Sequence, residues 1–185
     1  MTTRISVSLS KMDDKFIEDL RKKYPGEVRL DIQVVDLDAV PSFTEEHFWN
    51  IIALLDWNTP EDRDEVLAPA VASLSAHPVS HIYLFEDMVS EKLYQLDTRA
   101  HAQAAYPDGS HFSEDGFLYI RAAVVASGRE RYEAVLRDPS QMPSGEDFEP
   151  LLSLPALAYE RQTGVPFDYV SPTSYETYAN EEGWL

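Results

Sequence analysis

The sequence predicts an α+β protein in which a helical domain dominates and a small β-α-β element comes first. From residue 43 onward, apolar side chains recur every three or four residues, and polar caps, glycines and prolines separate one run from the next. Before residue 43, two short segments alternate apolar and polar side chains, which is typical of half-buried strands. We therefore place a β-α-β appendage at residues 1–42 and a helical domain at residues 43–185.

The appendage is expected to hold two strands and one helix. Residues 4–10 (RISVSLS) and residues 28–35 (VRLDIQVV) alternate in the manner of strands. Between them, residues 13–24 (DDKFIEDLRKKY) place acids first and cations last, as the helix dipole favours. Two strands are too few to be stable alone, so the appendage should pack on the chain that follows.

The domain should consist mainly of helices in sequence. We expect a helix capped by Thr44, one that begins at Thr59-Pro60 and contains Pro69, and the longest over about 78–97. Shorter helices are expected over 98–106, after Gly128 and over 147–161, with a weak helix or tail at the C-terminus. The aromatic residues of that tail should pack onto the core.

The stretch from Ser113 to Tyr132 is the most regular of these helices. Ser113 is placed to cap it, and Glu114 and Asp115 occupy its first turn. Its apolar face carries Phe117, Ile120, Val124 and Val125. Arg121 lies among these residues, and an unpaired buried charge is very costly. Arg121 should therefore either bind an anionic ligand or join two elements through an internal carboxylate.

Residues 43–159 resemble a bacterial family catalogued as domain-of-unknown-function family 4240. Its FW-x-x-I helix is matched by Phe48, Trp49 and Ile52. Its signature opens S-D/E-D-G-F and continues with Arg, Gly and Tyr, matched by Ser113, Glu114, Asp115, Gly116, Phe117, Arg121, Gly128 and Tyr132. The sequence departs from the signature at Ile120, where the family has Phe, and at Ala123, where it has Trp. The resemblance implies a mainly helical fold and no established activity.

Charge restricts the possible partners. The 15 Lys and Arg residues against 33 Asp and Glu residues give a net charge of −18. Such a chain repels nucleic acids and anionic membranes, so we expect neither as a partner, whereas a basic protein would be attracted. Acidity that serves only solubility is the alternative. The sequence has no long apolar run, no secretory signal and no cysteine, for which a cytoplasmic location is the simplest interpretation.

No motif indicates a cofactor. The sequence lacks both glycine-rich phosphate-binding patterns and the G-x-S-x-G nucleophile elbow. His77 and His81 have a spacing known from metal ligands, but Pro78 lies between them and no third ligand is evident. We interpret them as residues at a helix start and expect no metal and no cofactor.

Five side chains are the candidate binding residues: Trp49, Glu114, Asp115, Arg121 and Tyr132. Trp49 flanks an apolar stripe, and the other four belong to the stretch that begins at Ser113. Glu114 and Asp115 could bind a metal together with Asp108 or His111. The preference of a helix N-terminus for negative charge explains these two acids as well.

Two hypotheses for function follow. The favoured one is a non-enzymatic binding or regulatory module whose acidic face meets a basic protein, for example an immunity-type inhibitor. The alternative is an enzyme or small-molecule-binding domain with a pocket near Asp115 and Arg121. The alternative requires that Arg121 is reachable from solvent and that Asp115 points into a cleft. The sequence leaves the oligomeric state open.

Overall fold

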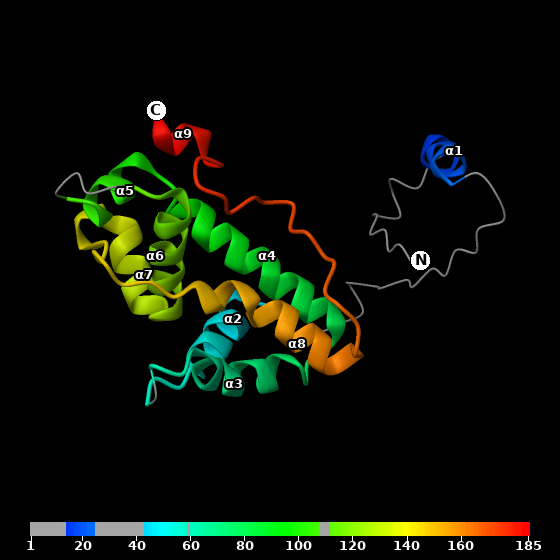
Figure 1. Cartoon of the computed structure of the whole chain (residues 1–185), viewed down its shortest axis with the longest axis horizontal. Coiled ribbons are helices and arrows are strands. Elements are labelled where there is room, and N and C mark those ends of the chain that lie inside the picture. Colours follow the sequence, from blue (N-terminus) through cyan, green and yellow to red (C-terminus); the bar gives the residue numbers. More distant parts are fainter. Residues whose placement is uncertain (1–13, 25–42, 59, 108–111) are drawn as a thin grey trace. The chain divides into compact units, whose positions relative to one another are not determined.

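The computed structural model of the chain describes residues 14–24, 43–58, 60–107 and 112–185 (Figure 1). The chain divides into two compact units, Met1–Asp36 and Leu37–Leu185. In the first unit, helix α1 spans Asp14–Lys23 and ends in three basic residues. This is the helix that the sequence predicted between the two strands.

The described residues form helices joined by turns and extended segments, and none of them forms a β-strand. The prediction of an α+β fold with a β-α-β element was therefore wrong, and the described fold is all-helical. The segments predicted as strands, residues 4–10 and 28–35, lie outside the described residues. Alternation of side chains shows which side of an extended segment faces inward and does not by itself specify a sheet. Among the described residues, the extended segment 165–180 shows alternating burial without forming a strand.

The second unit is built from helices of very different lengths. They are α2 (Glu45–Ile52), α3 (Arg63–Leu74), α4 (Val79–Gln95), α5 (Arg99–Ala105), α6 (Glu114–Ala126), α7 (Arg129–Arg137), α8 (Leu154–Thr163) and α9 (Glu181–Trp184). Two short 3-10 helices, η2 (Pro139–Gln141) and η3 (Glu149–Ser153), lie between α7 and α8. No helix in the described ranges combines the length and the apolar character that a membrane span requires.

Side-chain caps fix where several helices begin. The hydroxyl of Thr44 accepts from a backbone N–H in the first turn of α2, as predicted, and Ser113 does the same for α6. The predicted start of α3 at Thr59-Pro60 was too early. Asp62 caps α3 instead, because its carboxylate accepts from the backbone N–H of Glu65.

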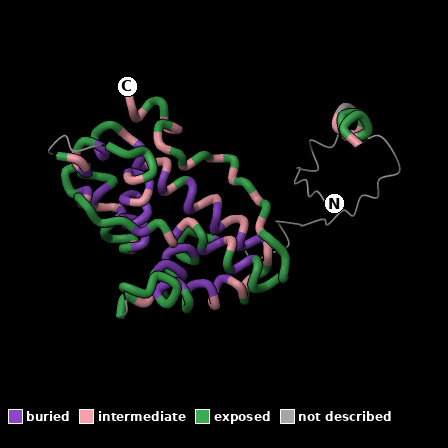
Figure 2. Tube along the Cα trace, in the orientation of Figure 1, coloured by how far each residue is buried: buried purple, intermediate pink, exposed green. Residues whose placement is uncertain are grey.

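Helix α6 is the centre of the core. It packs against α4, α5, α7 and η3, while α3 and α8 pack against each other and α8 also packs on α4. The buried residues of α6 are Phe117, Leu118, Ile120, Arg121, Ala122, Ala123, Val124, Val125 and Ala126. Burial therefore reaches around the helix, beyond the single face that the spacing of its large apolar residues indicates (Figure 2).

Residues 165–180, which we call the C-terminal strap, run back along α4 to α9, which packs against α5 (Figure 1). Alternate side chains are partly buried: Phe167, Tyr169, Ser171, Thr173, Tyr175 and Thr177. The ring of Phe167 lies 5.2 Å from that of Tyr159 on α8 and 6.1 Å from that of Tyr83 on α4. The predicted packing of these tail aromatics onto the core is confirmed at Phe167.

Candidate functional site

Arg121 lies inside the helical unit with a side chain that is 0% exposed. Its Nη1 donates to the carbonyl of Leu93 on α4 over 2.8 Å, and its Nη2 donates to Thr177 Oγ1 on the strap over 2.9 Å. The guanidinium carbon lies 4.8 Å from the centre of the Phe117 ring. Burial lowers the pKa of Arg121 to about 10, so the group remains charged at neutral pH.

Arg121 forms an ion pair with Asp97, which is also completely buried. Its Oδ1 lies 3.9 Å from Nη2 of Arg121. The same carboxylate accepts from the backbone N–H groups of Tyr178 and Asn180 and from the indole N–H of Trp184. Arg121 and Asp97 therefore join α4 and α6 to the C-terminal end of the chain. A ligand in solution cannot reach this arginine, so the requirement of the small-molecule hypothesis is not met at Arg121.

Trp49 and Tyr132 are brought together, with their ring centres 5.3 Å apart. Lys92 of α4 places its ammonium group 5.3 Å from the Tyr132 ring centre and 5.9 Å from that of Trp49. Glu45 accepts from Lys92 over 2.6 Å and from the Trp49 indole over 3.1 Å. The hydrogen bond from Lys92 lowers the pKa of Glu45. Both rings are buried, so this cluster holds α2, α4 and α7 together.

Glu114 and Asp115 are exposed in the first turn of α6. The backbone carbonyl of Glu114 accepts a hydrogen bond from the Thr177 hydroxyl over 2.8 Å. Asp108 and His111, considered with these acids as metal ligands, lie outside the described residues. Neither Glu114 nor Asp115 lines the two best-formed hollows of the surface. Their position supports the interpretation as acids at a helix N-terminus.

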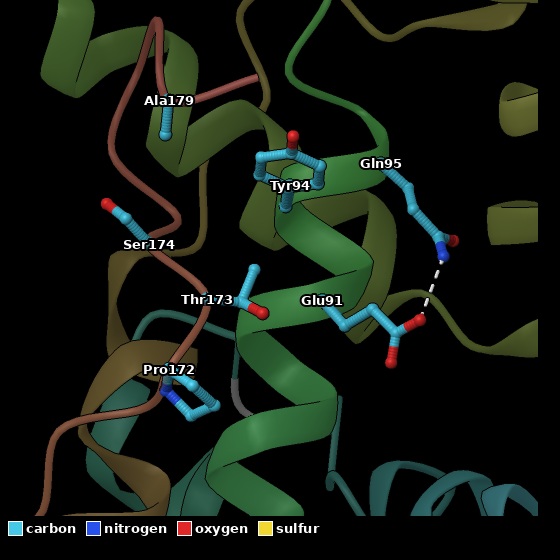
Figure 3. Close-up of a pocket in the computed structure, with 7 residues that line it drawn as sticks. All are labelled: Glu91, Tyr94, Gln95, Pro172, Thr173, Ser174 and Ala179. Atoms are coloured by element: carbon cyan, nitrogen blue, oxygen red, sulfur yellow. Dashed lines mark hydrogen bonds between the residues drawn. The ribbon is translucent and has the colours of Figure 1, made fainter. Parts of the chain in front are cut away.

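The first of these hollows is an open groove between α4 and the C-terminal strap (Figure 3). It is lined by Glu91, Tyr94, Gln95, Pro172, Thr173, Ser174 and Ala179. Its one carboxylate, that of Glu91, already accepts from the Gln95 amide over 3.3 Å. The groove therefore presents no group of convergent charges to a ligand.

The second hollow lies beside Trp57, in the connection from α2 to α3. It is lined by Trp57, Ala123, Ser127, Gly145, Glu146, Asp147 and Phe148. The Trp57 indole is 46% exposed, and its ring centre lies 4.9 Å from that of the buried Phe148. Asp147 accepts from Arg63 over 2.9 Å. A lone tryptophan in a turn has no periodic signal, so Trp57 was not among the residues predicted to bind.

The described histidines of the helical unit include a close pair, His77 and His81. His77 and His81 place their Nδ1 atoms 3.2 Å apart, and the ring of Phe43 lies between them and His47. Burial lowers the pKa of His77. No group of three or more histidine and carboxylate side chains in the described part of the chain has the arrangement of a metal site.

Comparison with known proteins gives one match. Searches of curated proteins and of solved structures returned nothing similar to this chain. Residues 43–161, which include α2 to α7 and most of α8, match a family described as protein of unknown function (DUF4240). The match covers more than half of the sequence, and the chain therefore belongs to the DUF4240 family.

Proposed function

We propose that this protein is a non-enzymatic module that binds a basic protein through the acidic surface of its helical unit. The observation that carries the proposal is the division of charge between the two units. Residues 1–36 contain 7 acidic and 7 basic side chains, a net charge of zero. Residues 37–185 contain 26 acidic and 8 basic side chains, a net charge of −18. The whole net charge of the protein therefore belongs to the helical unit.

This charge faces solvent. Nineteen acidic side chains of the helical unit are exposed in the described residues, against six basic ones. Two of these six already pair with acids, because Arg63 contacts Asp147 and Arg129 contacts Glu133. A surface with so large an excess of one sign accelerates encounter with a partner of the opposite sign and disfavours partners of like sign. An immunity-type inhibitor of a basic toxin is one concrete form of such a module.

The hollows of the helical unit offer few groups for catalysis. The described residues that line the two best-formed hollows include no histidine, and the groove in Figure 3 has a single carboxylate. The buried arginine is occupied by Leu93, Thr177 and Asp97. These features support a binding role for the surface over catalysis in a pocket.

The test is a capture experiment followed by reconstitution. The full chain is immobilised on a resin and incubated with native bacterial lysate at about 50 mM salt. The basic proteins that it captures are purified, and each is then titrated into the free chain. We expect a one-to-one complex whose dissociation constant rises about tenfold or more between 50 and 300 mM salt, because screening weakens exposed charge pairs. An absence of any basic protein that forms a stoichiometric complex would contradict the proposal.

A further inference from the structure

The hollow beside Trp57 combines an exposed aromatic face with carboxylates. Trp57 lines it together with Glu146, Asp147 and Phe148 of one loop, and the Trp57 ring contacts that of Phe148. Trp57 is one of the most exposed large apolar side chains in the helical unit, with 46% of its surface accessible. Tryptophan is among the residue types that most often contribute strongly to binding at protein interfaces.

Some polar groups of the hollow have no hydrogen-bond or ion-pair partner among the described residues. Asp147 is paired with Arg63, whereas Glu146 makes no hydrogen bond or ion pair with any described residue. The indole N–H of Trp57 also has no acceptor among the described residues. An incoming cation would thus find a free carboxylate and the open face of an indole in one place.

More acidic side chains lie near the hollow. Glu61, Asp62, Asp64 and Glu65 are exposed at the start of α3. The contact between Arg63 and Asp147 joins this start of α3 to the loop that carries Glu146. A basic segment bound at the hollow would therefore contact both Trp57 and these carboxylates. Such charge complementarity favours a basic protein as the partner.

We propose that this hollow receives an arginine side chain of the basic partner, stacked on Trp57 and paired with Glu146. Arginine fits better than lysine, because its planar guanidinium stacks on an indole and donates in a fork to a carboxylate. This inference rests on the proposed function, because it places the contact with the basic partner at one position on the acidic surface.

The test uses nonaarginine as the probe and the full chain as the receptor. The affinities of the wild type and all variants are measured at low salt by isothermal titration calorimetry. In the wild type, the indole resonance of Trp57 in nitrogen-15 NMR spectra, which a Trp57→Phe variant assigns, shows where the peptide binds. We expect the Trp57 indole to shift at the lowest peptide concentrations, and nonaarginine to bind more tightly than nonalysine. Trp57→Ala should weaken binding about fivefold, while Trp57→Phe keeps most of the affinity.

Charge-matched variants separate this site from general attraction. Glu146→Gln removes one charge at the hollow, which is lined by Ala123 and Ser127 at the C-terminal end of α6. Glu181→Gln removes one charge on α9, whose Trp184 contacts Phe117 near the N-terminal end of α6. We expect a loss of about fivefold for Glu146→Gln and little change for Glu181→Gln. Because both acids are exposed, melting curves of Glu146→Gln and Glu181→Gln should match the wild type. Trp57→Ala loses the contact with Phe148 and should melt at a lower temperature, so its affinity is measured well below its melting temperature.

Three outcomes would overturn the inference. They are equal losses from Glu146→Gln and Glu181→Gln, full affinity of Trp57→Ala, or no binding of nonaarginine at all. Each would leave the proposed function to the reconstitution with a captured basic protein, since a diffuse acidic surface can still bind one. Failure of that reconstitution, in contrast, would remove the proposed function itself.

Discussion

Nη2 of Arg121 lies 3.9 Å from Oδ1 of Asp97, and neither side chain is accessible to solvent. Arg121 belongs to α6, and Asp97 follows the end of α4. Around this pair, the Thr177 hydroxyl and the backbone N–H groups of Tyr178 and Asn180 bring in the C-terminal strap. A charge pair at this position makes the stability of the helical unit depend on residues far outside the matched family region.

The first prediction concerns Arg121. Arg121→Ala should lower the free energy of unfolding by about 3–5 kcal/mol, because it leaves the carboxylate of Asp97 buried without its charged partner. Arg121→Lys should be nearly as harmful, since one ammonium group cannot reach both Leu93 and Thr177 in the directions of the guanidinium. Urea unfolding followed by circular dichroism measures both values.

Arg129→Ala is the matched control for this loss. Arg129 pairs with Glu133 on α7, and both side chains are about half exposed. Exposed pairs of this kind contribute little, so the change should stay within about 0.5 kcal/mol. If Arg121→Ala is no more harmful than Arg129→Ala, the buried pair does not stabilise the fold.

Sequence patterns predicted the helical unit well where local chemistry decides. Thr44 and Ser113 cap helices as expected, and α4 is the longest helix described, because caps and apolar spacing act within a few residues. The same patterns predicted strands that no described residue forms. Alternation reports which side chains face inward, and the strap shows such alternation of burial without any sheet.

The partners of the candidate residues could not be predicted. The sequence marked Arg121 as in need of a partner, but Asp97 is 24 residues away and Thr177 is 56 residues away. Contacts at such separations depend on how α4, α6 and the strap fold back on one another, for which no local signal exists. Trp57 carries no periodic signal, and its contact with Phe148 joins residues even farther apart in the sequence.

The second prediction tests how closely α9 is seated. A Cβ added at Gly183 would lie 2.9 Å from the carbonyl oxygen of Asp97 and 2.8 Å from a methyl group of Thr98. Gly183→Ala should therefore push α9 away and cost about 1–3 kcal/mol, although alanine favours helices. Hydrogen exchange should become faster across residues 176–185. Glu182→Ala, a change at an exposed residue of the same helix, should leave hydrogen exchange slow. Equal exchange rates in the two variants would show that α9 does not pack closely against Asp97 and Thr98.

The third prediction concerns the ammonium group of Lys92. This group bridges Glu45 and the rings of Trp49 and Tyr132 while its stem is largely buried. Lys92→Ala should lower the free energy of unfolding by about 1–2 kcal/mol, and Lys92→Met by less, because methionine keeps the apolar stem. Urea unfolding of both variants measures how much of the loss comes from the charge and how much from the apolar stem. Equal losses from the two would show that the charge alone matters, contrary to the packing described.

The fourth prediction is a dependence of stability on pH that arises at Glu86. This side chain of α4 is 8% exposed, and no described residue makes a hydrogen bond or ion pair with its carboxyl group. Burial, aided by the charge of Asp87, raises the pKa of Glu86 from 4.5 to about 7. Tyr169 and Tyr175 of the strap are the titratable groups that feel its charge from the other side.

Proton binding by Glu86 determines whether the free energy of unfolding rises or falls with pH. Between pH 4.5 and 7 the folded chain holds a proton on Glu86 that the unfolded chain has released, so the free energy of unfolding falls as pH rises through this range. The full effect is at most about 3 kcal/mol. Glu86→Gln has no such proton to lose and should be more stable than the wild type at pH 8, with a difference that shrinks toward pH 5.

Glu91→Gln gives the comparison on the same helix. Glu91 is exposed, so its change removes the same formal charge from α4 without removing a buried acid. Urea unfolding of the three proteins at pH 5, 6, 7 and 8 isolates the contribution of Glu86, because Glu86→Gln differs from the wild type only at this side chain. A constant offset of Glu86→Gln from the wild type across this range would mean that Glu86 is ionised in the folded protein, and that the strap covers a charge.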